Sequence, residues 1–77
     1  MSDLFTLLTQ QFPAASFSHG DYQLGLGAFP EWDSLGHFNL LLLIEQHYAV
    51  RFEPNELTEL KRLADIKQAL QSKGVAV

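Results

Sequence analysis

Apolar side chains recur at helical spacing in three separate stretches of this chain. In residues 3–12, threonines and glutamines occupy one face of the expected helix. The opposite face holds five apolar side chains, Leu4, Phe5, Leu7, Leu8 and Phe12. Ser2 is suited to cap this stretch and Asp3 to its first turn. Pro13 ends it, because proline disfavours helical backbone at the preceding residue. We therefore predict a first helix over residues 3–12.

The second stretch, residues 34–48, carries apolar side chains on two faces. With about 100° between successive residues, the face predicted to enter the core holds His37, Phe38, Leu40, Leu41, Ile44 and Tyr48. The other face holds Leu35, Asn39, Leu42 and Gln46, with Leu43 near it and Glu45 at its edge. A face that met only solvent would not need leucines. We expect it to contact a partner; the alternative is that the preceding loop covers Leu42 and Leu43.

The third stretch begins at Pro54, which suits the first position of a helix, and has Glu56 in its first turn. Its apolar stripe consists of Leu57, Leu60, Leu63, Ile66 and Leu70. Gly74 is expected to end it. The pattern is compatible with one helix or with two over residues 54–73.

The long segment between the first two helices, residues 13–32, has no helical or strand period and is punctuated by glycine and proline. It nevertheless carries large apolar side chains, namely Phe17, Tyr22, Leu24, Leu26, Phe29 and Trp32. We expect these to fold back over the helices, so that the segment is a pinned loop. No stretch alternates as a strand does. The predicted fold is all-α, a small bundle of three or four helices with one long loop, in a single domain over residues 1–77.

The net charge of −4 is unevenly distributed. Residues 1–50 hold five acids and no lysine or arginine, whereas residues 51–77 hold five bases and four acids. Such a one-sign surface disfavours nucleic acid and favours basic partner surfaces. The alternative, which the charge alone favours, is that mild acidity only aids solubility. The chain has no cysteine, no basic leader pattern at its start, and a longest apolar run, Leu40–Ile44, far too short to span a bilayer. We expect a cytoplasmic monomer that neither binds nucleic acid nor inserts into a membrane.

Few residues offer catalytic or metal chemistry. The three histidines, His19, His37 and His47, lack metal-ligand spacing, and we expect His37 to be a packed, hydrogen-bonded core residue. Ser34 and His37 could form a nucleophile and base, but the orienting group and oxyanion donors have no obvious source. We therefore expect the protein to have no enzymatic activity of its own, with a small serine hydrolase as the weakest alternative.

Ser34 lies where the loop meets the second helix, within Trp32-Asp33-Ser34-Leu35-Gly36-His37. A hydroxyl at this end of a helix adjoins free backbone N–H groups and a positive dipole, which favour a bound anion. Two interpretations follow: Ser34 is an ordinary N-cap, or it is a site that carries a phosphate-linked group.

The motifs around Ser34 occur in an order that resembles the acyl carrier protein family. The family keeps Asp-Ser-Leu at the start of its second helix, here Asp33-Ser34-Leu35. Leu40 to Phe52 resembles the family's apolar helix, acidic turn and short hydrophobic loop, while Pro54-Asn55-Glu56-Leu57 and Leu63-Ala64-Asp65-Ile66 resemble the starts of its third and fourth helices. The segment Trp32-Asp33-Ser34-Leu35-Gly36-His37 resembles the attachment segment of stand-alone carriers that serve polyketide and related specialised pathways. The resemblance covers essentially the whole chain.

This resemblance implies that Ser34 carries 4′-phosphopantetheine, loaded from coenzyme A by a phosphopantetheinyl transferase that uses Mg²⁺. An acyl-loading ligase or acyltransferase and downstream synthases or transferases would be the other partners. It also implies that Asp33, Leu35, Asn39, Leu42, Glu45 and Gln46 contact them. The family often has acids along this face, whereas Asn39 and Gln46 are neutral here. We expect a dedicated pathway; an aminoacyl carrier of the D-alanyl type and an unmodified docking domain are the alternatives.

Overall fold

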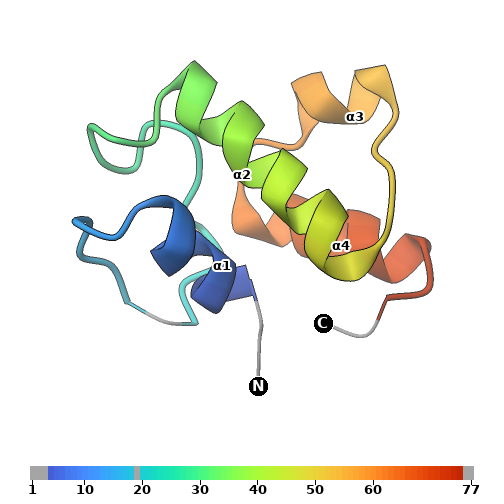
Figure 1. Cartoon of the computed structure of the whole chain (residues 1–77), viewed down its shortest axis with the longest axis horizontal. Helices are drawn as coiled ribbons and strands as arrows, with labels where there is room; N and C mark the ends of the chain where they lie inside the picture. The colour runs from blue at the N-terminus through green and yellow to red at the C-terminus, as the bar shows by residue number, and fades with distance from the viewer. Residues whose placement is uncertain (1–3, 19, 76–77) are drawn as a thin grey trace.

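Four helices follow one another in the computed structural model, which describes residues 4–18 and 20–75. They are α1 (Leu4–Gln11), α2 (Ser34–Tyr48), α3 (Pro54–Glu59) and α4 (Leu63–Ser72), as Figure 1 shows. Within the described residues there are no strands, so the predicted all-α fold is confirmed. The expected roles of Ser2 and Asp3 at the start of α1 lie outside the described residues.

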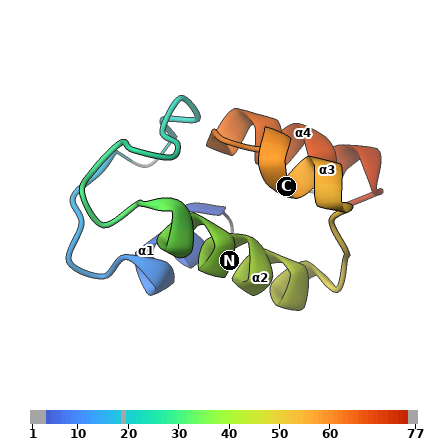
Figure 2. The ribbon, with the colours of Figure 1, turned by 90° about the horizontal axis from the view of Figure 1, so that it is seen from above.

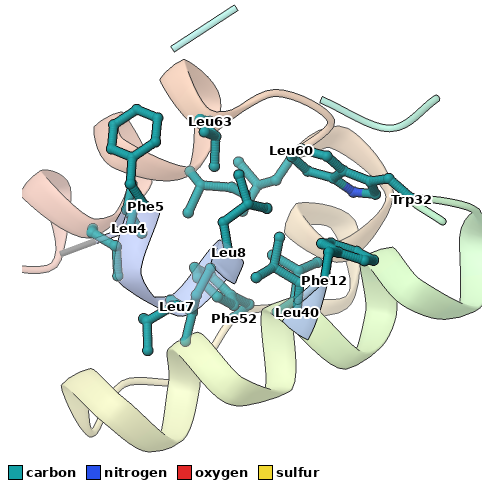
Figure 3. Close-up of a cluster of buried hydrophobic side chains, with 14 residues drawn as sticks. Leu4, Phe5, Leu7, Leu8, Phe12, Trp32, Leu40, Phe52, Leu60 and Leu63 are labelled. Atoms are coloured by element: carbon teal, nitrogen blue, oxygen red, sulfur yellow. The ribbon is translucent and has the colours of Figure 1, made fainter. Parts of the chain in front are cut away.

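The helices enclose one apolar core. When the molecule is viewed from above, α1 and α2 lie on one side and α3 and α4 on the other (Figure 2). The face predicted for α1 is buried throughout, including Phe12 just beyond its end. The same buried cluster, part of which is labelled in Figure 3, also includes Trp32, Leu40, Leu41, Ile44, Phe52, Leu60, Leu63, Ile66 and Leu70.

The third apolar stretch forms two helices, separated by extended backbone from Leu60 to Arg62. The long loop causes this break, because its backbone bonds to the interrupted segment. The N–H of Leu26 donates to the carbonyl of Lys61 at 2.8 Å, and the N–H of Leu63 donates to the carbonyl of Leu24 at 2.8 Å. A Cβ at Gly25 would lie 2.3 Å from the Lys61 carbonyl oxygen, so only glycine permits this approach.

The loop is pinned by its aromatic side chains, as predicted. Trp32 is fully buried and stacks on Phe12 with ring centroids 5.6 Å apart. Tyr22 meets Phe5 edge to face at 5.1 Å. Leu26 is the exception, because 41% of it is exposed.

Phe38 does not enter the core, and its predicted burial is wrong. It is 46% exposed, whereas the neighbouring His37 is buried. Trp32 and His37 fill the core at this end of α2. Successive residues of a helix point about 100° apart, so Phe38 points away from the core position that His37 occupies. The buried face of α2 is therefore narrower than the sequence pattern indicates.

No helix within the described ranges has the length and apolar character that crossing a membrane requires.

Candidate functional site

Asp33, not Ser34, caps helix α2. Asp33 has extended backbone, and its carboxylate accepts a hydrogen bond from the N–H of Gly36 at 2.8 Å. Its carbonyl accepts the next N–H, that of His37, at 2.8 Å. The interpretation of Ser34 as an ordinary N-cap is therefore wrong. Both residue types are good caps, and the register of the helix decides between them.

Ser34 is the first residue of α2 and is exposed. Its hydroxyl forms no hydrogen bond with the described residues. The backbone N–H groups of Ser34 and Leu35 belong to the first turn, where a helix supplies no acceptor, and the described part of the chain supplies none either. A free hydroxyl beside two free N–H groups at the positive end of a helix suits an attached phosphate.

Gly36 allows the start of α2 to lie directly against the loop. The residue is buried, and a Cβ there would lie 2.8 Å from the Glu31 carbonyl oxygen and 2.9 Å from Cε1 of Phe12. A larger residue would push the helix start away from the loop. The glycine thus fixes where Ser34 lies relative to the core.

His37 is fully engaged below the site. Its Nδ1 accepts a hydrogen bond from the indole N–H of Trp32 at 2.9 Å, so the ring proton lies on Nε2, which donates to the carbonyl of Leu60. Burial lowers the pKa of His37, while the bond to Leu60 opposes that effect. The prediction of a packed, hydrogen-bonded histidine is confirmed. With both ring nitrogens bonded, His37 offers Ser34 no general base.

A groove of about 360 Å³ opens beside Ser34, between α2 and α3. Its walls are the apolar side chains of Leu26, Phe38 and Leu57, and its remaining lining comes from Ser34, His37, Thr58 and Lys61. Sequence reasoning missed Phe38 and Lys61. The signal for Phe38 was its helical spacing from Leu35 and Leu42, whereas Lys61 comes to the groove through tertiary contacts that no local pattern records.

The face of α2 predicted to contact partners is open. Leu35 is 69% exposed and Leu42 39%, and Asn39 and Gln46 are exposed beside them. Phe38 joins the two leucines at positions i, i+3 and i+7, and we call Leu35, Phe38 and Leu42 the outer stripe. The loop does not cover Leu42.

Two neighbours of the outer stripe are held inward. Leu43 is half-buried and packs against the core. Glu45 is also half-buried, and its carboxylate accepts a hydrogen bond from the N–H of Phe52 at 2.7 Å. Glu45 therefore anchors the connection after α2 as well as lying at the edge of the open face.

Comparisons with family models, with curated proteins and with solved structures each found no match for the chain. The residues within the described ranges include no group of three or more histidines and acids that could hold a metal ion. The functional interpretation therefore stands on the chain's own motifs and on the geometry around Ser34.

Proposed function

We propose that this protein is an acyl carrier protein that holds its cargo on 4′-phosphopantetheine attached to Ser34. The observation that carries the proposal is the exposed Ser34 hydroxyl, which starts α2 without serving as its cap. The resemblance of the segment around Ser34 to the carrier family supports it. The pathway we favour is polyketide, fatty-acid-like or other specialised biosynthesis.

In this proposal the prosthetic group supplies a flexible arm ending in a thiol, which holds acyl groups as thioesters. The chain itself has no cysteine, so the arm would bear the only thiol. Ser34 Oγ forms a bond to the phosphorus that bears pantetheine in coenzyme A. The pyrophosphate bond breaks, adenosine 3′,5′-bisphosphate leaves, and a base of the transferase takes the hydroxyl proton. The free N–H groups of Ser34 and Leu35 would favour the negative charge of the phosphodiester at this position.

The outer stripe is the surface we propose for the partner enzymes. Asp33 and Leu35 flank Ser34 and would meet the phosphopantetheinyl transferase, whereas Leu42 and Glu45 lie further along α2 and would meet the loading and downstream enzymes. Leu35, Phe38 and Leu42 supply exposed apolar surface on this face, and the neighbouring Asn39 and Gln46 carry no charge. We infer recognition by apolar contact more than by electrostatic steering.

A docking domain whose Ser34 stays unmodified is the second candidate. The exposed outer stripe favours it, because an apolar helix face of this kind can serve as a binding surface without any arm. The two candidates share the surface and differ only at the hydroxyl.

An intact-mass measurement distinguishes the two candidates. The protein is incubated with a broad-specificity phosphopantetheinyl transferase, coenzyme A and Mg²⁺. We expect the mass to rise by one phosphopantetheinyl group, the rise to vanish in Ser34→Ala, and the rise to persist in Ser72→Ala, which removes another exposed serine. An unchanged mass, or a rise that survives Ser34→Ala, would refute the carrier proposal and leave the docking domain.

A further inference from the structure

Lys61 is brought to the groove beside Ser34 by backbone contacts on both of its flanks. Its own carbonyl accepts the N–H of Leu26 at 2.8 Å, and Gly25 packs closely against the same carbonyl. The carbonyl of the preceding residue, Leu60, is bonded to Nε2 of the buried His37. The main chain at Lys61 is thus held by the loop on one side and by α2 on the other.

Lys61 is the one residue of the groove lining that carries a charge. The other lining residues are neutral, and the polar ones among them are Ser34, His37 and Thr58. Lys61 is exposed, and its ammonium forms no ion pair or hydrogen bond with the described residues. No carboxylate lies in the lining to neutralise it.

A second groove shares Leu26 and Lys61 with the first and adds another positive charge nearby. Lys61 and Arg62 both line it, again with no acid in its lining. Arg62 is held there by a hydrogen bond from its guanidinium to the side-chain oxygen of Gln23 at 3.1 Å. The half of the chain that contains Ser34 has no lysine or arginine, so these two cations come from the other half.

We propose that the groove selects an acyl group with a free carboxylate at its far end, the carboxylate pairing with Lys61. This inference rests on the proposed function, because it needs a cargo tethered at Ser34. The methylene chain of such a cargo would lie against Leu26, Phe38 and Leu57, and its charged end would meet the ammonium. An aminoacyl cargo would bring a second positive charge to the same place, which disfavours it.

The test uses two cargos of equal length on the full chain. A promiscuous transferase attaches the arm from succinyl-coenzyme A or from butyryl-coenzyme A, and intact mass verifies each product. Amide chemical shifts of groove residues are then compared with those of the arm-only protein. Because an exposed ion pair changes a population about 1.4- to fivefold, we expect succinyl to shift Lys61, Thr58 and Leu57 more strongly than butyryl by that factor. Added salt should reduce the difference.

Matched variants decide what the shifts mean. Lys61→Gln should reduce the succinyl shifts to the butyryl level, whereas Arg51→Gln, which removes an exposed positive charge outside this groove, should leave them unchanged. Equal shifts from the two cargos would overturn the inference. The inference would also be overturned if the arm alone, without an acyl group, already shifted the Lys61 signal relative to the unmodified protein. Lys61 would then pair with the phosphodiester and not with the cargo. If no arm attaches to Ser34, the proposed function fails and the inference with it; attachment without charge preference removes the inference alone.

Discussion

The indole N–H of Trp32 donates to Nδ1 of His37 across 2.9 Å, and this bond connects the end of the long loop to the first turns of α2. Because Nδ1 is an acceptor, Nε2 carries the proton that goes to the carbonyl of Leu60. One neutral imidazole therefore joins the loop, α2 and the break between α3 and α4. The same residue, His37, lines the groove beside Ser34, so these bonds hold the elements that surround Ser34.

The stability of the fold should depend on pH through His37. Burial lowers its pKa in the folded protein, whereas the unfolded chain titrates near the usual value of about 6.5. The unfolded state then binds more protons, so the contribution to stability is complete above that value and is lost as the pH falls toward the folded pKa. For one proton the slope is at most about 1.4 kcal/mol per pH unit.

Urea unfolding at several pH values between about 5.5 and 7.5 measures this slope around the ordinary histidine pKa. His37→Gln removes the titrating group and should flatten the curve, while His47→Gln, at an exposed position on the same helix, should keep the slope. A wild-type stability that does not change over this range would contradict the expected direction.

Substitutions at the start of α2 should separate capping from modification. Asp33→Ala removes the side chain that accepts from Gly36, and should lower the free energy of unfolding by about 0.5–2 kcal/mol. Ser34→Ala should change it by less than about 0.5 kcal/mol, because the hydroxyl has no partner among the described residues. Thermal or chemical denaturation of both variants without the arm tests this order; a larger loss at Ser34 would restore the serine as the cap.

Gly36→Ala should destabilise the protein although alanine favours helices. The added Cβ would overlap the Glu31 carbonyl and the ring of Phe12, and overpacking of this kind costs about 1–3 kcal/mol. That exceeds the gain in helix propensity of about 1 kcal/mol. Asn39→Ala, at an exposed position of the same helix, should be neutral or slightly stabilising. Chemical denaturation compares the two, and a stabilised Gly36→Ala would show that the close approach is absent.

Ala49→Gly should stabilise the protein. Ala49 ends α2 with a left-handed backbone, φ 56° and ψ 45°, and its N–H donates to the carbonyl of Glu45. Glycine adopts this conformation without a steric penalty, so we expect a gain of about 0.5–1 kcal/mol. The same change inside α4, Ala69→Gly, should instead cost about 1 kcal/mol. Melting temperatures that move in opposite directions would support the assignment, and a parallel loss would contradict it.

Leu35→Ala should slow arm attachment without altering the fold. The side chain adjoins Ser34 and is 69% exposed, so its removal creates no cavity in the core. Loss of a central contact residue costs more than about 1 kcal/mol of binding, or roughly fivefold in kcat/KM for the transferase. Leu42→Ala, two turns along the outer stripe, is the matched control and should react at nearly the wild-type rate. Equal slowing by both variants would place the transferase along the whole stripe.

The sequence predicted the bounds of α2 because they depend on local signals: the end of the glycine- and proline-rich loop before Ser34 and an uninterrupted apolar pattern up to Tyr48. It left the number of helices after Pro54 open for a physical reason. The break at Leu60–Arg62 comes from hydrogen bonds to the backbone of the loop, and nothing within the segment itself interrupts a helix. The aromatic content of the loop predicted that it packs on the helices. It did not predict which residues form hydrogen bonds with the backbone of the loop.

The candidate site also has features that the sequence predicts and features that depend on the folded chain. Ser34 and the open face of α2 follow from motif and helical spacing. The choice between Asp33 and Ser34 as the cap depends on a helix register shift of one residue, and the two side chains are chemically equivalent for that task. Lys61 reaches the groove from far along the chain, so only the folded molecule brings it together with Ser34.

The fold holds Lys61 through its backbone. Its main-chain carbonyl accepts a hydrogen bond from the N–H of Leu26, whereas its ammonium forms no hydrogen bond or ion pair with the described residues. Substitution at position 61 should therefore cost little stability, since exposed side chains that form no hydrogen bond or ion pair are tolerant of substitution. If the protein is the carrier that we propose, a single codon change at position 61 would alter its cargo preference while the scaffold around Ser34 stayed as it is.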